Sequence, residues 1–160
     1  MIPRHLFSVV LCLALATLAH AADPTPAHAP YPENFLNWKK IKATSLDPAA
    51  PATAELTDAH FVYANAAALE GLRTGTYPEG AVFVLDILKV ERKGGTTTLG
   101  QRASTSTMVR DASAASTGGW RFEDYDIVTK AALEIDVVKD CYVCHTKVAK
   151  RQHVFTRLKP

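Results

Sequence analysis

The chain has few cysteines and few methionines, and neither sign of charge dominates it. Three cysteines in 160 residues are too few for a disulfide framework, and a chain of this length can bury a core without one. Eighteen Lys and Arg against 16 Asp and Glu give a formal net charge of +2, without the clustered basic excess of a nucleic-acid-binding protein. No apolar run after residue 21 approaches the length of a membrane span. We therefore expect one domain with no nucleic-acid partner.

The first 21 residues have the pattern of a signal peptide. Arg4 and His5 precede an apolar run from Leu6 to Ala19, and Ala19-His20-Ala21 has the small-x-small pattern of a cleavage site. We expect cleavage after Ala21, export to a bacterial periplasm, and a mature chain free of the membrane. An uncleaved membrane anchor is the alternative.

The remaining chain predicts an α+β domain. Residues 22–30 are expected to form a flexible leader and residues 31–160 the folded domain. Strands are predicted over the ranges 40–46, 56–64, 81–90, 96–110 and 120–128. Asn65 is a candidate N-cap for a short helix that Gly71 or Gly75 ends, and Gly94-Gly95 predicts a hairpin turn. We expect an antiparallel sheet of about five strands with short helices, and a C-terminal helix at about 137–150.

The chemistry of the mature chain is concentrated in Cys141-Tyr142-Val143-Cys144-His145. Cys12 leaves with the signal peptide, so both remaining cysteines belong to this C-x-x-C-H pentapeptide. On a helical turn two thiols at this spacing can add to the two vinyl groups on one edge of a haem. The following imidazole then becomes the proximal iron ligand. The motif predicts one covalently attached haem c, held by Cys141 and Cys144, with His145 as metal ligand.

Three other interpretations of the motif stay open. A disulfide oxidoreductase also uses C-x-x-C, but at the start of a helix in an early βαβ unit. A zinc site needs further Cys or His ligands at matching spacing, and the sequence pairs none off. A structural disulfide gives no reason for His145.

The position of the motif bears on the iron's sixth ligand. Fifteen residues follow His145 in the 160-residue chain, and none of them is Met. The remaining methionine of the mature chain, Met108, is either a sixth ligand or a core residue. A C-terminal motif without a following Met favours a five-coordinate iron that is open to small ligands.

Several sequence blocks are similar to the cytochrome P-460 superfamily. They are Y-P-E-N-F-L-N-W at 31–38, F-V-Y-A-N at 61–65, L-R-T-G-T-Y-P-E-G at 72–80, V-F-V-L-D at 82–86, M-V-R-D at 108–111, T-G-G-W at 117–120, C-Y-V-C-H at 141–145 and V-F-T at 154–156. The resemblance implies a β-rich homodimer with a haem of this kind. It also implies one of two branches. Cytochromes P-460 bond a lysine to the haem ring and oxidise hydroxylamine, whereas cytochromes c-prime-beta have an apolar distal pocket and bind nitric oxide and related gases.

Three positions favour the c-prime-beta branch. Leu85 stands where the resemblance places the cross-linking lysine, Ser106 where it places the distal carboxylate, and His60 where it places the distal arginine. A one-residue slip would bring Asp86 over the haem instead. Lys89 shares the predicted face of Leu85 but lies two pleats away, too far to take over the lysine's bond.

Other residues have two interpretations each. Phe61 and Phe83 join Leu85 as distal candidates, with plain sheet core as the alternative, and His60 is a distal donor or a surface residue. Arg110 contacts a haem propionate or solvent, and Trp120 is core or packs on haem. The basic residues from 147 to 159 form a solvated tail or a docking patch for a redox partner protein.

The sequence leaves three hypotheses. The first is a periplasmic c-type haem protein that binds nitric oxide or carbon monoxide at an apolar pocket, with no catalytic residues. The second is an oxidoreductase acting on hydroxylamine or nitrogen oxides. The third is a simple electron-transfer cytochrome with a six-coordinate iron.

Overall fold

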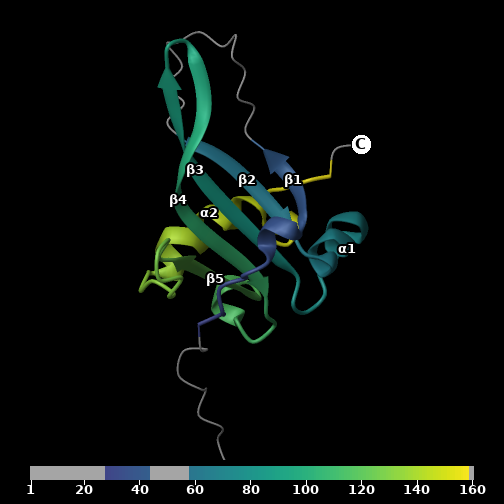
Figure 1. Ribbon diagram of the computed structural model, residues 1–160. Helices are drawn as coiled ribbons and strands as arrows, with labels where there is room; N and C mark the ends of the chain where they lie inside the picture. The colour runs from purple at the N-terminus through teal and green to yellow at the C-terminus, as the bar shows by residue number, and fades with distance from the viewer. Residues whose placement is uncertain (1–27, 44–57, 159–160) are drawn as a thin grey trace, which may run out of the picture.

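One antiparallel sheet forms the centre of the computed structural model, which describes residues 28–43 and 58–158 (Figure 1). Its strands lie in sequence order, β1-β2-β3-β4-β5. They span Lys39–Ala43 (β1), Asp58–Ala64 (β2), Val82–Lys93 (β3), Thr96–Arg110 (β4) and Trp120–Tyr125 (β5). The predicted α+β class and the five-stranded sheet are confirmed.

Part of the expected leader lies against the sheet. The Nδ1 atom of His28 lies 2.9 Å from the carboxylate of Glu123, and the backbone N–H of Ala29 donates to the same carboxylate at 3.0 Å. The hydroxyl of Tyr125 donates to the carbonyl of Ala29 at 3.2 Å. Residues 28–30 are thus held on β5, whereas the sequence predicts a flexible leader up to residue 30. The expected signal peptide, 1–21, and residues 22–27 lie outside the described residues.

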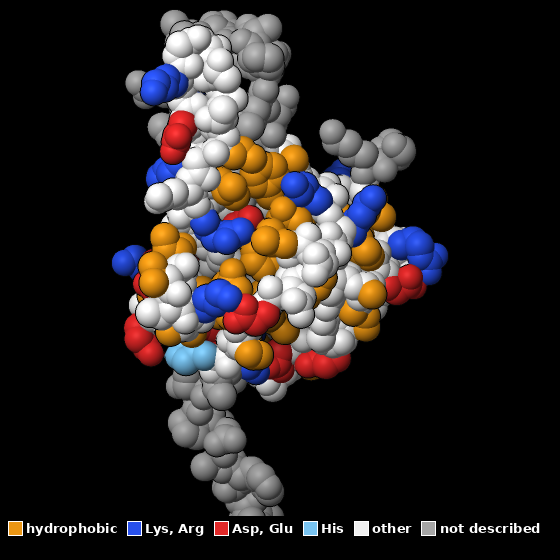
Figure 2. Space-filling model, in the orientation of Figure 1, with side chains coloured by type: hydrophobic (Ala, Val, Ile, Leu, Met, Phe, Trp, Pro, Cys, Tyr) orange, Lys and Arg blue, Asp and Glu red, His pale blue; other side chains and the backbone are white. Residues whose placement is uncertain are grey.

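The two faces of the sheet carry separate cores, because successive side chains of a strand point to opposite sides. On β3, Phe83 belongs to one core and its neighbour Val84 to the other. The first core includes Ala64, Phe83, Met108, Trp120, Phe122 and Val154. The second includes Phe35, Ala59, Phe61, Tyr63 and Val84 and is covered by the short 3₁₀-helix η1, Phe35–Asn37. Figure 2 views the molecule from the side of η1, where hydrophobic side chains lie between Lys and Arg side chains.

Helix α1, Ala66–Thr74, begins and ends as the sequence predicts. The Oδ1 atom of Asn65 accepts hydrogen bonds from the N–H of Ala68 at 2.8 Å and from the N–H of Val82 at 3.0 Å. The Nδ2 of Asn65 donates to the carbonyl of Gly80 at 3.0 Å. The helix ends at Gly75 in the left-handed conformation, which costs glycine little. One N-cap side chain therefore joins α1 to the start of β3.

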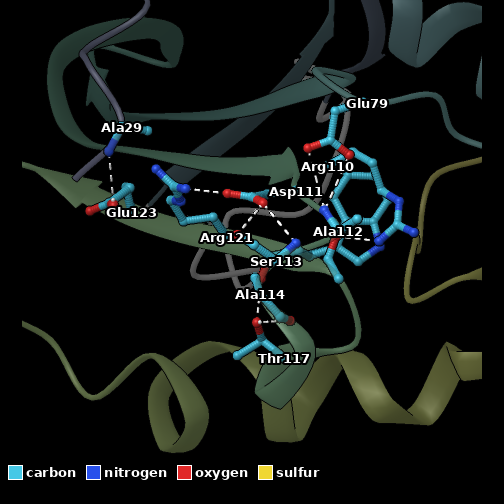
Figure 3. A network of polar contacts seen from close by, with 12 residues as sticks. Ala29, Glu79, Arg110, Asp111, Ala112, Ser113, Ala114, Thr117, Arg121 and Glu123 are labelled. Atoms are coloured by element: carbon cyan, nitrogen blue, oxygen red, sulfur yellow. Dashed lines mark hydrogen bonds and ion pairs between the residues drawn. The ribbon is translucent and has the colours of Figure 1, made fainter. Parts of the chain in front are cut away.

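The connection between β4 and β5 is tied by a polar network (Figure 3). The carboxylate of Asp111 accepts from the N–H and hydroxyl of Ser113, at 2.9 and 2.6 Å, and pairs with Arg121. The carboxylate of Glu79 accepts from the N–H of Ala112 at 3.1 Å. Within this connection lies the 3₁₀-helix η2, Ala115–Thr117. These bonds fix the chain reversal that sets the register of β5 against β4.

The C-terminal segment crosses the sheet face of the first core. Its helical part consists of a π-helix, η3, at Val137–Tyr142, a short α-helix, α2, at Val143–His145, and a 3₁₀-helix, η4, at Thr146–Arg151. The sequence predicts one helix over 137–150, and the structure has three short helical pieces in its place. Among the described residues no helix has the length and apolarity to cross a membrane.

Candidate functional site

A cavity of about 450 Å³ lies between the first face of the sheet and the C-terminal segment. This is a volume typical of small-molecule sites. From the sheet it is lined mainly by Val62, Phe83, Leu85, Ser106, Met108 and Phe122. From the C-terminal segment it is lined by Asp140, Cys141, Cys144, His145, Val154, Phe155 and Thr156. The whole C-x-x-C-H chemistry therefore faces one largely apolar space.

The helical turn that presents the cysteines begins at Asp136, whose carboxylate accepts from the N–H of Lys139 at 3.1 Å. Cys141 is half-buried and Cys144 is exposed, and both thiols are free. No cluster of three or more His, Cys, Asp or Glu side chains that could hold a metal ion occurs in residues 28–43 and 58–158. A zinc site therefore finds no ligand set in the part of the chain that the structure describes.

The environment of Cys141 disfavours thiol–disulfide exchange. Burial raises the pKa of the Cys141 thiol to about 11, and the carboxylates of Asp124 and Asp140 add to the effect. Cysteines that act as redox nucleophiles have lowered pKa values, because the thiolate is the reactive form. Cys141 is a protonated, half-buried thiol at the wall of a cavity. This environment suits permanent attachment of a cofactor better than repeated thiol–disulfide exchange.

His145 is held in a fixed orientation. Its Nδ1–H donates to the backbone carbonyl of His153 at 2.7 Å, which leaves Nε2 as the nitrogen with a free lone pair. Burial lowers the pKa of His145 and favours the neutral ring, although the bond to His153 opposes this shift. The ring packs edge-on between Phe122 and Phe155, with centroid distances of 4.9 and 5.0 Å. A neutral imidazole oriented through one nitrogen is the usual state of a metal-ligating histidine.

The backbone that supplies this carbonyl is strained. Gln152 and His153 both have positive φ, at 50° and 66°. Residues other than Gly and Asn rarely adopt this backbone conformation. Two such residues in succession turn the chain so that the carbonyl of His153 meets the His145 ring. The residue types around Q-H-V give no signal of this turn, so it was not predictable from the sequence.

Most of the predicted distal residues reach the cavity. Phe83, Leu85, Ser106 and His60 all line it, and Leu85 lies directly opposite Ser106 in the β3–β4 pairing. Met108 is buried in the first core and also lines the cavity. Its position is therefore compatible with both interpretations of this residue, a core residue and a sixth ligand.

Phe61 does not reach the cavity. In the β2–β3 register Val62 pairs with Leu85 and Phe61 pairs with Asp86, so Phe61 faces the second core. The prediction of Phe61 as a distal residue is wrong for this reason, and Val62 takes its place. Asp86 also points away from the cavity and forms an ion pair with Arg102 at 2.5 Å. Lys89 pairs with Asp58 at 2.9 Å.

Arg110 and Trp120 lie outside the cavity lining. The guanidinium of Arg110 bonds to the carbonyl of Gly119 and lies over the Trp120 ring, 5.8 Å from its centroid. Trp120 is fully buried in the first core. In the basic tail, Lys150, Arg151 and Arg157 line a separate hollow beside the end of α1.

Three charged residues that line the cavity were not predicted from the sequence: Lys42 on β1, Asp124 on β5 and Asp140 on η3. Asp124 faces Ser106 across the β4–β5 pairing, so a carboxylate does reach this wall, although from another strand. The two-residue period of a strand could have indicated that Asp124, two residues after Phe122 in the predicted strand, shares its face.

An antiparallel sheet whose face closes an apolar cavity beside a C-x-x-C-H turn defines a class of sheet protein suited to holding a haem. The family model described as Cytochrome P460 matches residues 32–156, and the chain belongs to this family. Membership implies a haem cofactor. No match to the chain was found among curated proteins. The residues present fit a haem, because two free thiols and an oriented neutral imidazole line the same apolar cavity.

Proposed function

We propose that this protein is an exported c-type haem protein of the c-prime-beta kind that binds small gases such as nitric oxide. Cys141 and Cys144 hold one haem covalently, and Nε2 of His145 ligates the iron. A haem held here would supply an iron that can bind diatomic gases without help from hydrogen-bond donors. The proposal includes a periplasmic location and a homodimer, both of which rest on the leader sequence and the family resemblance.

One observation carries this proposal: the centre of the sheet wall is aliphatic. Val62 and Leu85 pair with each other across β2 and β3, and both line the cavity. Leu85 carries no amine at the position where the sister branch has its cross-linking lysine, so it can shield the iron from water but cannot bond the ring. Neither Val62 nor Leu85 offers a hydrogen-bond donor, which favours nitric oxide and carbon monoxide over polar ligands at this part of the wall.

Absorption spectra of the purified ferrous protein, with and without nitric oxide and carbon monoxide, test this function. A high-spin spectrum that changes with both gases is the expected result. A low-spin spectrum insensitive to both would contradict gas binding and support electron transfer, in which case the basic tail becomes the docking patch for a redox partner. A red-shifted ferrous band of the P-460 type would contradict the branch assignment.

Asp124 favours a second candidate function, an oxidoreductase acting on hydroxylamine or a nitrogen oxide. Its carboxylate lines the cavity, so it can accept or return a proton at this wall. Hydroxylamine-dependent reduction of a dye acceptor tests this candidate. If this candidate is correct, the wild type oxidises hydroxylamine and Asp124→Asn does not. A wild type that does not oxidise hydroxylamine leaves gas binding as the function.

A further inference from the structure

A bulge in β1 places two nearby lysines on opposite faces of the sheet. Lys40 pairs with Tyr63 and Lys42 pairs with Val62, and the register shifts between the two lysines. The ammonium of Lys40 lies 4.6 Å from the ring centroid of Phe61, on the face away from the cavity. Lys42 lines the cavity. In a regular strand residues two apart share a face, so the bulge turns Lys42 to the face opposite Lys40.

Lys42 stands at one end of a row of paired residues that crosses the whole sheet. The row runs Lys42, Val62, Leu85, Ser106, Asp124, one residue from each strand, and every member lines the cavity. Four strand spacings of about 4.8 Å separate its ends by about 19 Å across the sheet, in the direction of the interstrand hydrogen bonds. The row therefore has a cation at the β1 end, two aliphatic side chains and a serine in the middle, and a carboxylate at the β5 end.

The cysteines lie at the carboxylate end of this row. Helix η3, which contains Cys141, contacts β5, and the Cys141 thiol is close enough to Asp124 to sense its charge. Asp140 adds a second carboxylate beside Cys141 on the cavity wall. A haem attached to Cys141 would therefore have its thioether edge at the β5 side. In haem the two propionates project from the edge opposite the vinyl groups, so they would extend toward β1.

Charge favours the same orientation. Asp124 and Asp140 repel the propionates from the cysteine end, and among the described residues that line the cavity Lys42 alone carries a fixed positive charge. Lys42 is exposed, and no carboxylate pairs with it within residues 28–43 and 58–158. Its ammonium is thus free to form an ion pair at the mouth of the cavity.

We propose that Lys42 binds a propionate of the haem and thereby fixes the orientation of the ring between β1 and the cysteine turn. This inference rests on the proposed haem function. It assigns Lys42 as a cofactor-binding residue. The function of the β1 bulge is then to turn this side chain toward the cavity.

The test compares the haem-loaded wild type with Lys42→Met, Lys42→Arg and the matched control Lys40→Met, whose side chain lies on the other face. The midpoint potential is measured across pH, because ionisation of a propionate produces an inflection in this profile. An ion pair lowers the pKa of the carboxyl, so Lys42→Met is expected to move the inflection upward by about one pH unit. Lys42→Arg is expected to restore the profile, and Lys40→Met to leave it unchanged.

Identical profiles for Lys42→Met and Lys40→Met would overturn the inference while leaving the haem function intact. Loss of a red-shifted ferrous band in Lys42→Met would also overturn it, because that result would show Lys42 bonded to the ring itself. Wild-type protein that carries no haem after full maturation would overturn the proposed function along with the inference.

Discussion

His145 and His153 are joined by a hydrogen bond from Nδ1–H of the first to the backbone carbonyl of the second, at 2.7 Å. This bond fixes which ring nitrogen carries the proton, and it leaves Nε2 with the lone pair that the proposed iron ligand requires. The proposed proximal ligand therefore comes from the C-x-x-C-H turn, and its orientation comes from a strained backbone turn eight residues later.

We expect His145→Ala to keep the covalent haem and to lose the axial nitrogen ligand. The thioether bonds proposed at Cys141 and Cys144 do not include the imidazole, so haem that has been attached should stay attached while the absorption spectrum changes. Imidazole added to the solution should restore the wild-type spectrum, since it can occupy the space that the deleted ring leaves between Phe122 and Phe155. A variant with an unchanged spectrum before imidazole is added would contradict the assignment of His145.

Leu85→Ala should open the aliphatic part of the cavity wall, where we propose that gases bind. Deleting the side chain removes bulk from the cavity, so we expect carbon monoxide to associate faster, as measured by flash photolysis of the ferrous complex. The loss of packing should lower the free energy of unfolding by about 2 kcal/mol. Ile87→Ala is the control, because Ile87 lies on the same strand and is not among the residues that line the cavity. Equal association rates in the two variants would argue against a distal role for Leu85.

Asn65→Ala should destabilise the junction between α1 and β3. It removes the N-cap acceptor of Ala68 and Val82 and the donor to Gly80, so we expect a loss of about 2 kcal/mol in urea denaturation. Asn65→Asp keeps the acceptor oxygen and loses only the donor, and it should cost less. An Asp variant as unstable as the Ala variant would show that the cap bonds are not what Asn65 contributes.

The contact between His28 and Glu123 should make stability depend on pH. The hydrogen bond to Glu123 and the charge of Glu123 raise the pKa of His28 above its ordinary value of 6.5. A raised folded-state pKa means that the contribution is complete below about pH 6.5 and is lost as the pH rises through the folded value. The difference in unfolding free energy between wild type and His28→Asn should therefore shrink from pH 5.5 to pH 8.5. A difference that grows with pH would contradict this contact.

The local elements were predictable where a single residue type decides them. Asn65 caps its helix, Gly94-Gly95 makes the hairpin with positive φ at both residues, and β4 has the predicted bounds, 96–110. The end of β5 was not predictable to the residue. The strand stops at Tyr125 because the side chain of Asp126 accepts hydrogen bonds from the N–H groups of Val128 and Thr129, which starts a turn.

The candidate site was predictable in its attachment motif and less so in its walls. Cys141, Cys144 and His145 are adjacent in sequence, so their proximity needs no knowledge of the fold. Which side chains face them depends on register, and register depends on pairing across strands. Phe61 was misplaced because its partner is Asp86, and Lys42 was missed because a bulge interrupts the alternation of β1.

The intact mass of the protein under denaturing conditions, after expression with c-type haem maturation machinery, tests the central claim most directly. Wild type should retain the mass of one haem on the mature chain when fully unfolded, and the double variant Cys141→Ala, Cys144→Ala should show the mass of the polypeptide alone. A wild-type spectrum that contains only the unmodified polypeptide, or a double variant that still carries the haem mass, would contradict covalent attachment through these two thiols.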